Sequence, residues 1–211
     1  MLFRSRTKAI EHLTAIQNTP LMATNPNLQM TLGRLHMRAG KADVAIPILE
    51  KVAAQAPWAA EPQLLLYEAN VSLGKIDDAE RALVAAAEAN PRYFAQLGQF
   101  YERTNKWADA AEAYEQAGLF EDAVVEYGRA LALCPSFLDL RTRLGASYRE
   151  AGNWPAAERE FKVVLAENPS LMGPRLQLGM TYFAAGRRSD ARAEWERELV
   201  LEPDHRVARM Y

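Results

Sequence analysis

The sequence predicts an all-α fold, a solenoid in which antiparallel helical hairpins stack one after another. Two series of residues carry this prediction, because both step along the 211-residue chain by 34, 44, 34 and 34 positions. They are the prolines at 57, 91, 135, 169 and 203, and the glycines at 40, 74, 118, 152 and 186. A third marker is the Leu-Gly pair, found at 32–33, 97–98, 144–145 and 178–179. Such a period indicates stacked units, since each unit buries its apolar face only against its neighbours.

Each period reads as two helices. In residues 28–57 apolar side chains recur at intervals of three and four, which is typical of amphipathic helices. Gly40 ends the first helix, because glycine readily takes the left-handed conformation of a C-cap. Asp43 stands at the start of the second helix, where the dipole favours negative charge, and Pro57 stops that helix. No segment alternates with period two, so no strand is predicted.

The glycines of the Leu-Gly pairs are expected to lie where the two helices of a hairpin cross closely. A small residue of the second helix faces that crossing, and a large residue beside it fills the remaining space. The small positions are Ala45, Ala79, Ala110, Ala123, Ala157 and Ala191. The large positions are Leu49, Leu83, Tyr114, Tyr127, Phe161 and Trp195.

These offsets resemble those of the tetratricopeptide repeat family, whose 34-residue motif carries Leu-Gly, Tyr, Gly, Ala, a large aromatic residue and Pro. In the unit that begins at Leu138 the matching residues are Leu144, Gly145, Tyr148, Gly152, Ala157, Phe161 and Pro169. The next unit repeats the pattern, and the two units before residue 91 carry His36 and Asn70 in the tyrosine position. The resemblance implies a right-handed superhelix in which the first helix of each hairpin lines a concave groove.

An irregular junction interrupts the period near residues 91–135, where one step of 44 replaces two steps of 34. A helix over 107–117 fits two places there. It serves as the second helix after a helix over 92–104, and as the first helix before a helix over 120–133. Such a shared helix would reverse the order of all later helices and redirect the groove. The alternative is a deletion that local repacking absorbs.

The predicted organisation has five segments. They are an orphan helix of an incomplete repeat in 1–25, two repeats in 26–90, a three-helix junction in 91–137, two repeats in 138–205 and the start of a truncated repeat in 206–211. Solenoids normally end in polar capping repeats, and neither end reads as one. We therefore expect the chain to be a fragment of a longer repeat protein. With no long apolar run and no secretory signal at its start, it is expected to be cytoplasmic, without direct membrane insertion.

The sequence predicts a protein that is not an enzyme and uses no metal or cofactor. A net charge of -2 without a basic run argues against nucleic acid as a partner. The histidines at 12, 36 and 205 lie far apart, and His36 is expected to pack in the core or the groove. Cys134, the single cysteine, lies in an apolar run and is expected to be buried. Signatures of phosphate loops, zinc proteases and nucleophile elbows are absent.

By the resemblance, exposed positions of the first helices line the groove and contact peptides. They are Asn27, Met30, Arg34, Met37, Arg38, Leu64, Glu68, Arg92, Gln99, Arg103, Arg149, Met180 and Phe183. The set lacks the lysines and asparagines with which the family's chaperone adaptors clamp a carboxylate, so chaperone tails are not expected as ligands. Met180 and Phe183 predict a site for an apolar anchor, unless they pack against a further repeat.

Two functions follow from this reading. The leading one is a scaffold or adaptor that assembles protein complexes by binding peptide or protein partners in its concave groove. The second is the recognition domain of a larger enzyme or membrane-assembly protein. Further domains encoded beside the repeats would favour the second function.

Overall fold

The computed structural model describes residues 8, 11–15, 19 and 25–201. These residues are mainly helical and none lies in a β-strand, so the all-α prediction is confirmed. The chain divides into two compact units, with the boundary between Leu97 and Gly98. Most of the predicted orphan-helix segment and all of residues 206–211 lie outside the described residues.

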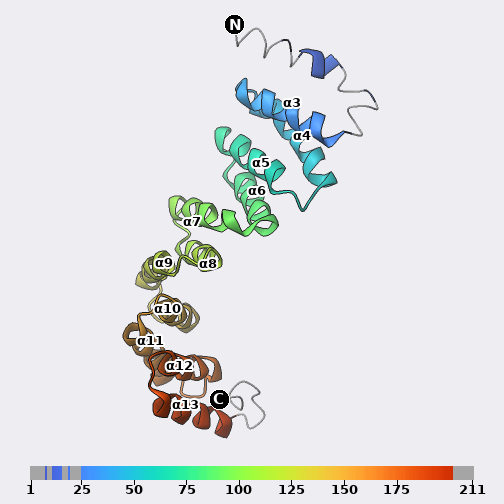
Figure 1. Cartoon of the computed structure of the whole chain (residues 1–211). Helices are drawn as coiled ribbons and strands as arrows, with labels where there is room; N and C mark the ends of the chain where they lie inside the picture. The colour runs from blue at the N-terminus through green and yellow to red at the C-terminus, as the bar shows by residue number, and fades with distance from the viewer. Residues whose placement is uncertain (1–7, 9–10, 16–18, 20–24, 202–211) are drawn as a thin grey trace. The chain divides into compact units, whose positions relative to one another are not determined.

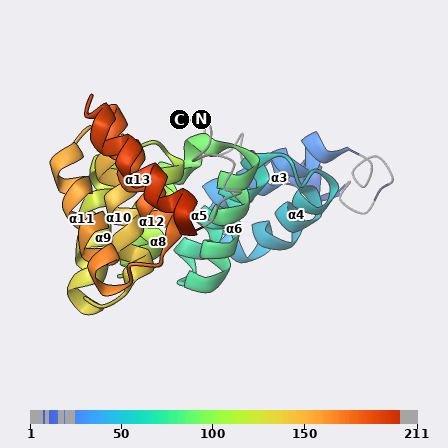
Figure 2. The ribbon, with the colours of Figure 1, turned by 90° about the horizontal axis from the view of Figure 1, so that it is seen from below.

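Two hairpins form the first unit. They consist of α3 (Pro26–Arg38), α4 (Ala42–Gln55), α5 (Ala60–Ser72) and α6 (Ile76–Ala89). Each helix packs against the next one along the chain, and Figure 2 shows α3 beside α4. A 3₁₀ turn, η1 (Pro91–Tyr93), follows α6. The helix predicted over 92–104 therefore begins as 3₁₀ structure and becomes α-helical only at Phe94.

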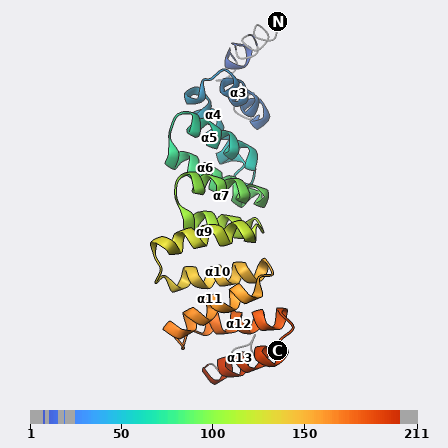
Figure 3. The same cartoon turned by 90° about the vertical axis from the view of Figure 1, so that its left-hand side faces the viewer.

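In the second unit the helices again succeed one another (Figures 1 and 3). They are α7 (Phe94–Arg103), whose first residues belong to the first unit, then α8 (Trp107–Gln116), α9 (Phe120–Leu133), α10 (Leu138–Glu150), α11 (Trp154–Glu167), α12 (Met172–Ala184) and α13 (Arg188–Leu201). From α8 to α13 consecutive helices pack against one another. This order is the stack of hairpins that the period predicts.

The turns inside the hairpins share one backbone motif. Gly40 has φ 72°, and the N–H of the next residue, Lys41, donates to the carbonyl of His36 at 3.0 Å, as in a Schellman motif. After α7 the same turn is made by Asn105 at φ 59°, with Lys106 N–H donating to the Tyr101 carbonyl at 2.9 Å. Asparagine tolerates this conformation, which explains why the glycine series skips this hairpin.

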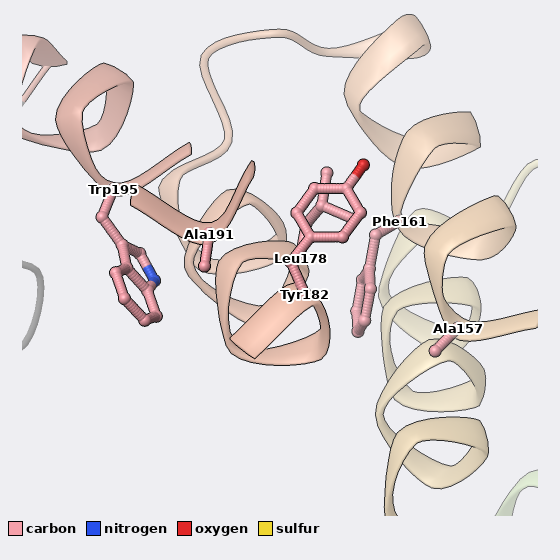
Figure 4. Close-up of a cluster of buried hydrophobic side chains, with 6 residues drawn as sticks. All are labelled: Ala157, Phe161, Leu178, Tyr182, Ala191 and Trp195. Carbon is pink, nitrogen blue, oxygen red and sulfur yellow. The ribbon is translucent and has the colours of Figure 1, made fainter. Parts of the chain in front are cut away.

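The close helix crossings lie where the Leu-Gly pairs predict them. A Cβ added at Gly145 would lie 2.8 Å from Cε1 of Phe161, so only glycine lets the ring pack there without a shift. Figure 4 shows the equivalent core at the end of the chain. Phe161 of α11 and Trp195 of α13 approach α12 from opposite sides, with Tyr182 between them.

Helix α8 corresponds to the predicted shared helix, and it packs against both α7 and α9. A Cβ at Gly98 of α7 would lie 2.7 Å from the Tyr114 ring of α8, the contact that a first helix makes with its second helix. On the same helix Ala111 packs in one buried cluster with Tyr127 of α9. The division of residues 91–137 stays a prediction, which these two contacts support.

One expectation about the core is wrong. Cys134, predicted to be buried, is exposed because it caps the C-terminus of α9, where the chain leaves the core. Its neighbour Leu133 is exposed as well. The apolar run continues to the last residues of α9, but the side chains at its end no longer face the core.

Candidate interaction surface

The predicted groove positions of α3 differ in exposure. Asn27 and Arg38 are exposed, whereas Met30 and Met37 lie partly buried against the core of the first unit. The Arg34 guanidinium forms an ion pair with Glu61 of α5, so its charge is already neutralised within the unit. Of the two predicted groove arginines on α3, Arg38 is therefore the one whose charge is free to meet a partner.

The remaining groove positions of the first unit lie on α5 and η1. Leu64 is partly buried and Glu68 is exposed on α5. Arg92 lies in the 3₁₀ turn, with its guanidinium 4.6 Å from the centre of the Tyr93 ring, a cation–π contact. These side chains present a mixed polar surface without a block of one charge.

In the second unit the structure brings Arg149, Met180 and Phe183 together. They line a hollow of about 260 Å³ with Glu150 and Trp195. One guanidinium nitrogen of Arg149 lies 3.8 Å from the Met180 sulfur, and another donates to Glu150 at 2.6 Å. The Phe183 ring is 46% exposed and lies 5.9 Å from the Trp195 ring. Gln99 and Arg103 of α7, both exposed, do not line this hollow.

Beside this surface a partly exposed charge network joins α11 to α12 and to the turn before α13. Glu158 accepts hydrogen bonds from Tyr182 at 3.0 Å, Lys162 at 2.6 Å and Arg187 at 2.7 Å. Desolvation raises the pKa of Glu158, but these hydrogen bonds outweigh it and lower the pKa below its usual value. The network stabilises the packing of these helices and leaves the carboxylate ionised.

Sequence reasoning missed a periodic ion pair. Arg141 bonds Glu160 at 2.7 Å and the Pro135 carbonyl at 3.1 Å. The residues 34 positions later repeat this arrangement, since Arg175 bonds Glu194 at 3.2 Å and the Pro169 carbonyl at 2.6 Å. Applied to charged residues, the 34-residue period would have found these pairs. Each fastens a first helix to the turn before it and to the helix after it.

The described residues hold neither the pattern of a metal site nor that of a membrane span. Within them no three His, Cys, Asp or Glu side chains gather as metal ligands would. His36 is 5% exposed, in line with the packing role predicted for it. In the described part of the chain no helix has the length and apolar character needed to span a membrane.

Comparison with protein families gives two matches. Residues 36–103 and 104–147 each match a tetratricopeptide repeat model. The chain belongs to the tetratricopeptide repeat family. As a member it has the all-α solenoid architecture that the resemblance implied, and comparison with curated proteins gives no match.

Comparison with solved structures gives matches that include proteins described as TPR proteins. YrrB, described as a TPR protein with an unusual peptide-binding site, is 18% identical over 92% of this chain and 94% of its own, with a TM-score of 0.43. TTC0263, a thermophilic TPR protein of Thermus thermophilus, is 22% identical over 88% and 96%, with a TM-score of 0.45. MamA protein is 20% identical over 84% and 92%, with a TM-score of 0.44.

Proposed function

We propose that this tetratricopeptide repeat chain is a protein-interaction scaffold that assembles complexes by binding peptide segments along its first helices. The observation that carries the proposal is the hollow at Arg149, Met180 and Phe183. Phe183 exposes 46% of its surface at the rim, where an apolar side chain of a partner would be desolvated against it. Met180 adds an adaptable thioether surface, and Arg149, paired with Glu150, forms one wall of the hollow.

The set of groove residues stays a proposal and is refined by the contacts described above. Arg34 is paired with Glu61, so it is expected to contribute less to binding than Arg38. Met30 and Met37 are held in the core of the first unit and would add only their exposed edges. The binding surface of the second unit therefore centres on Phe183.

A comparative pull-down tests this proposal. Phe183→Ala is expected to reduce the recovery of bound proteins at least about tenfold, since truncation of a binding hot spot costs about 2 kcal/mol or more. Val163→Ala is the matched control, because Val163 is similarly exposed at 42% but lies on the second helix α11. Equal recovery by both variants would show that the surface around Phe183 does not bind partners.

A further inference from the structure

A second hollow, of about 450 Å³, opens in the first unit between α4, α5 and α6. None of the thirteen predicted groove residues lines it. Its lining includes Ile46 and Glu50 of α4, Asn70 of α5 and Lys75 before α6. It is therefore a surface separate from the proposed peptide groove.

Asn70 gives this hollow a polar group that no other described residue bonds. The residue is only 6% exposed, and it lines the hollow. Within the described part of the chain its side-chain amide has no hydrogen-bond partner. The amide nitrogen and oxygen of Asn70 are not among the described polar atoms that are cut off from solvent, so they are open to a ligand that enters the hollow.

The last hairpin shows how the same site looks when it is filled. At the positions 112 residues further along the sequence, Tyr182 donates a hydrogen bond to Glu158 at 3.0 Å and fills the space between the helices. In the first unit Asn70 stands in place of the tyrosine and Ile46 in place of the glutamate. These two replacements remove the ring and its acceptor, and they leave the hollow open.

The charged residues around Tyr182 are paired with one another, whereas their counterparts around Asn70 are not. In the last hairpin Lys162 and Arg187 both bind the central Glu158, so they are neutralised by the chain itself. Their counterparts in the first unit are Glu50 and Lys75. Both line the hollow, and neither has an ion-pair partner among the described residues. The hollow thus presents the free carboxylate of Glu50 and the free ammonium of Lys75. It also presents the amides of Asn70 and Gln63, beside the ion pair of Arg81 with Asp78.

We propose that this hollow binds a free amino acid with a carboxamide side chain. Its α-carboxylate would pair with Lys75, its α-ammonium with Glu50 and its amide with Asn70. Charge-assisted hydrogen bonds are the strongest of these contacts, and a carboxamide matches Asn70 because each amide both donates and accepts. The volume lies in the range of about 300–1,000 Å³ that small-molecule sites occupy.

Titration of the isotope-labelled full chain with glutamine, followed by NMR, tests the proposal. Saturable shifts are expected for the side-chain amide of Asn70 and the backbone amide of Lys75. Glu50→Gln and Lys75→Met remove one charge each and are expected to weaken binding about tenfold, the effect of losing about 1.4 kcal/mol. Glu68→Gln, an equally exposed change on α5 outside the hollow, is expected to leave binding unchanged.

The double variant Ile46→Glu with Asn70→Tyr rebuilds the pair of the last hairpin and should abolish the shifts while the chain stays folded. If this variant does not fold, the Glu50 and Lys75 variants still test the proposal. Both residues are exposed, so their substitution is expected to leave the chain folded. No saturable shift up to about 50 mM glutamine, enough to detect a millimolar dissociation constant, would overturn the proposal. Equal binding of N-acetylglutamine amide, which lacks both charges, would overturn the assignment to a zwitterion.

Discussion

Gly145 and Gly128 both lie inside helices of the second unit, but only Gly145 is closely packed against another side chain. A Cβ at Gly145 would meet the Phe161 ring at 2.8 Å, whereas a Cβ at Gly128 would meet no atom within 4 Å. The first glycine is required by packing. The second only adds flexibility to the unfolded chain and weakens the helix that contains it.

Substitution by alanine should therefore change stability in opposite directions at these two positions. Gly145→Ala is expected to lower the free energy of unfolding by about 1–3 kcal/mol, the usual cost of overpacking. Gly128→Ala is expected to raise it by about 0.5–1 kcal/mol, because alanine favours the helix. Urea unfolding of both variants measures the difference. A shift of the same sign in both would contradict the close crossing.

His36 makes stability depend on pH. Burial, followed by the nearby charge of Lys41, lowers the pKa of His36 below its ordinary value of 6.5. The folded state then binds fewer protons than the unfolded state. The stabilising effect of neutral His36 is complete above about pH 6.5 and is lost as the pH falls through the folded-state pKa.

Replacing His36 by asparagine, the residue at the same motif position in the next hairpin, should remove this dependence. The chain is expected to lose stability between pH 7.5 and 5.5, and His36→Asn is expected to lose less over the same interval. Urea midpoints at the two pH values give the comparison, with His12→Asn as the control because His12 is exposed. Equal pH dependence of the chain and His36→Asn would show that His36 does not cause it.

At the scale of helices, the ion pair between Arg141 and Glu160 fastens α10 to α11. Both side chains are largely buried, at 22% and 18% exposure, so solvent screens the pair only in part. The pair of Arg192 and Glu196 on α13 is similar in length, 2.8 Å against 2.7 Å, but its side chains are 78% and 60% exposed.

Double-mutant cycles should separate these two pairs. Arg141→Met combined with Glu160→Gln is expected to give a coupling energy of about 1–2 kcal/mol, because the hydrogen bonds are charged and partly buried. Arg192→Met combined with Glu196→Gln is expected to give about 0.2–0.5 kcal/mol, the range of exposed pairs on one helix. Equal coupling energies would mean that burial does not strengthen the periodic pair.

For the molecule as a whole, stability rests on contacts between neighbouring helices. The strong contacts join consecutive helices, and a helix touches the next but one only weakly. In such a chain a local change weakens its own hairpin and the adjoining one before it reaches distant hairpins.

Trp195→Ala tests this localisation, because Trp195 is 4% exposed and packs in the core of the last hairpin. Loss of a buried tryptophan costs about 3–5 kcal/mol. Hydrogen exchange should become faster in α12 and α13, while protection in α3–α6 stays unchanged. A uniform loss of protection in all helices would show that the chain unfolds as one cooperative unit.

The sequence by itself determined the class of fold, the helices and the family, because helix caps and the small-residue crossings act over short sequence distances. The 34-residue period and the glycines at 33, 145 and 179 placed the hairpins and their close contacts. The glycine series did not predict the turn at Asn105, because asparagine there adopts the left-handed conformation that glycine adopts in the other turns. The exact start of α7 after η1 also lay beyond what a periodic pattern specifies.

Only the tertiary structure decided which side chains meet between helices. It showed that Arg34 is paired with Glu61, that Cys134 is exposed, and that Asn70 opens a hollow where Tyr182 closes one. The physical reason is that these outcomes depend on side chains from different helices at once. The period fixes the position of each residue in its hairpin, but the volume and charge of its neighbours decide whether that position is filled, paired or open to a ligand.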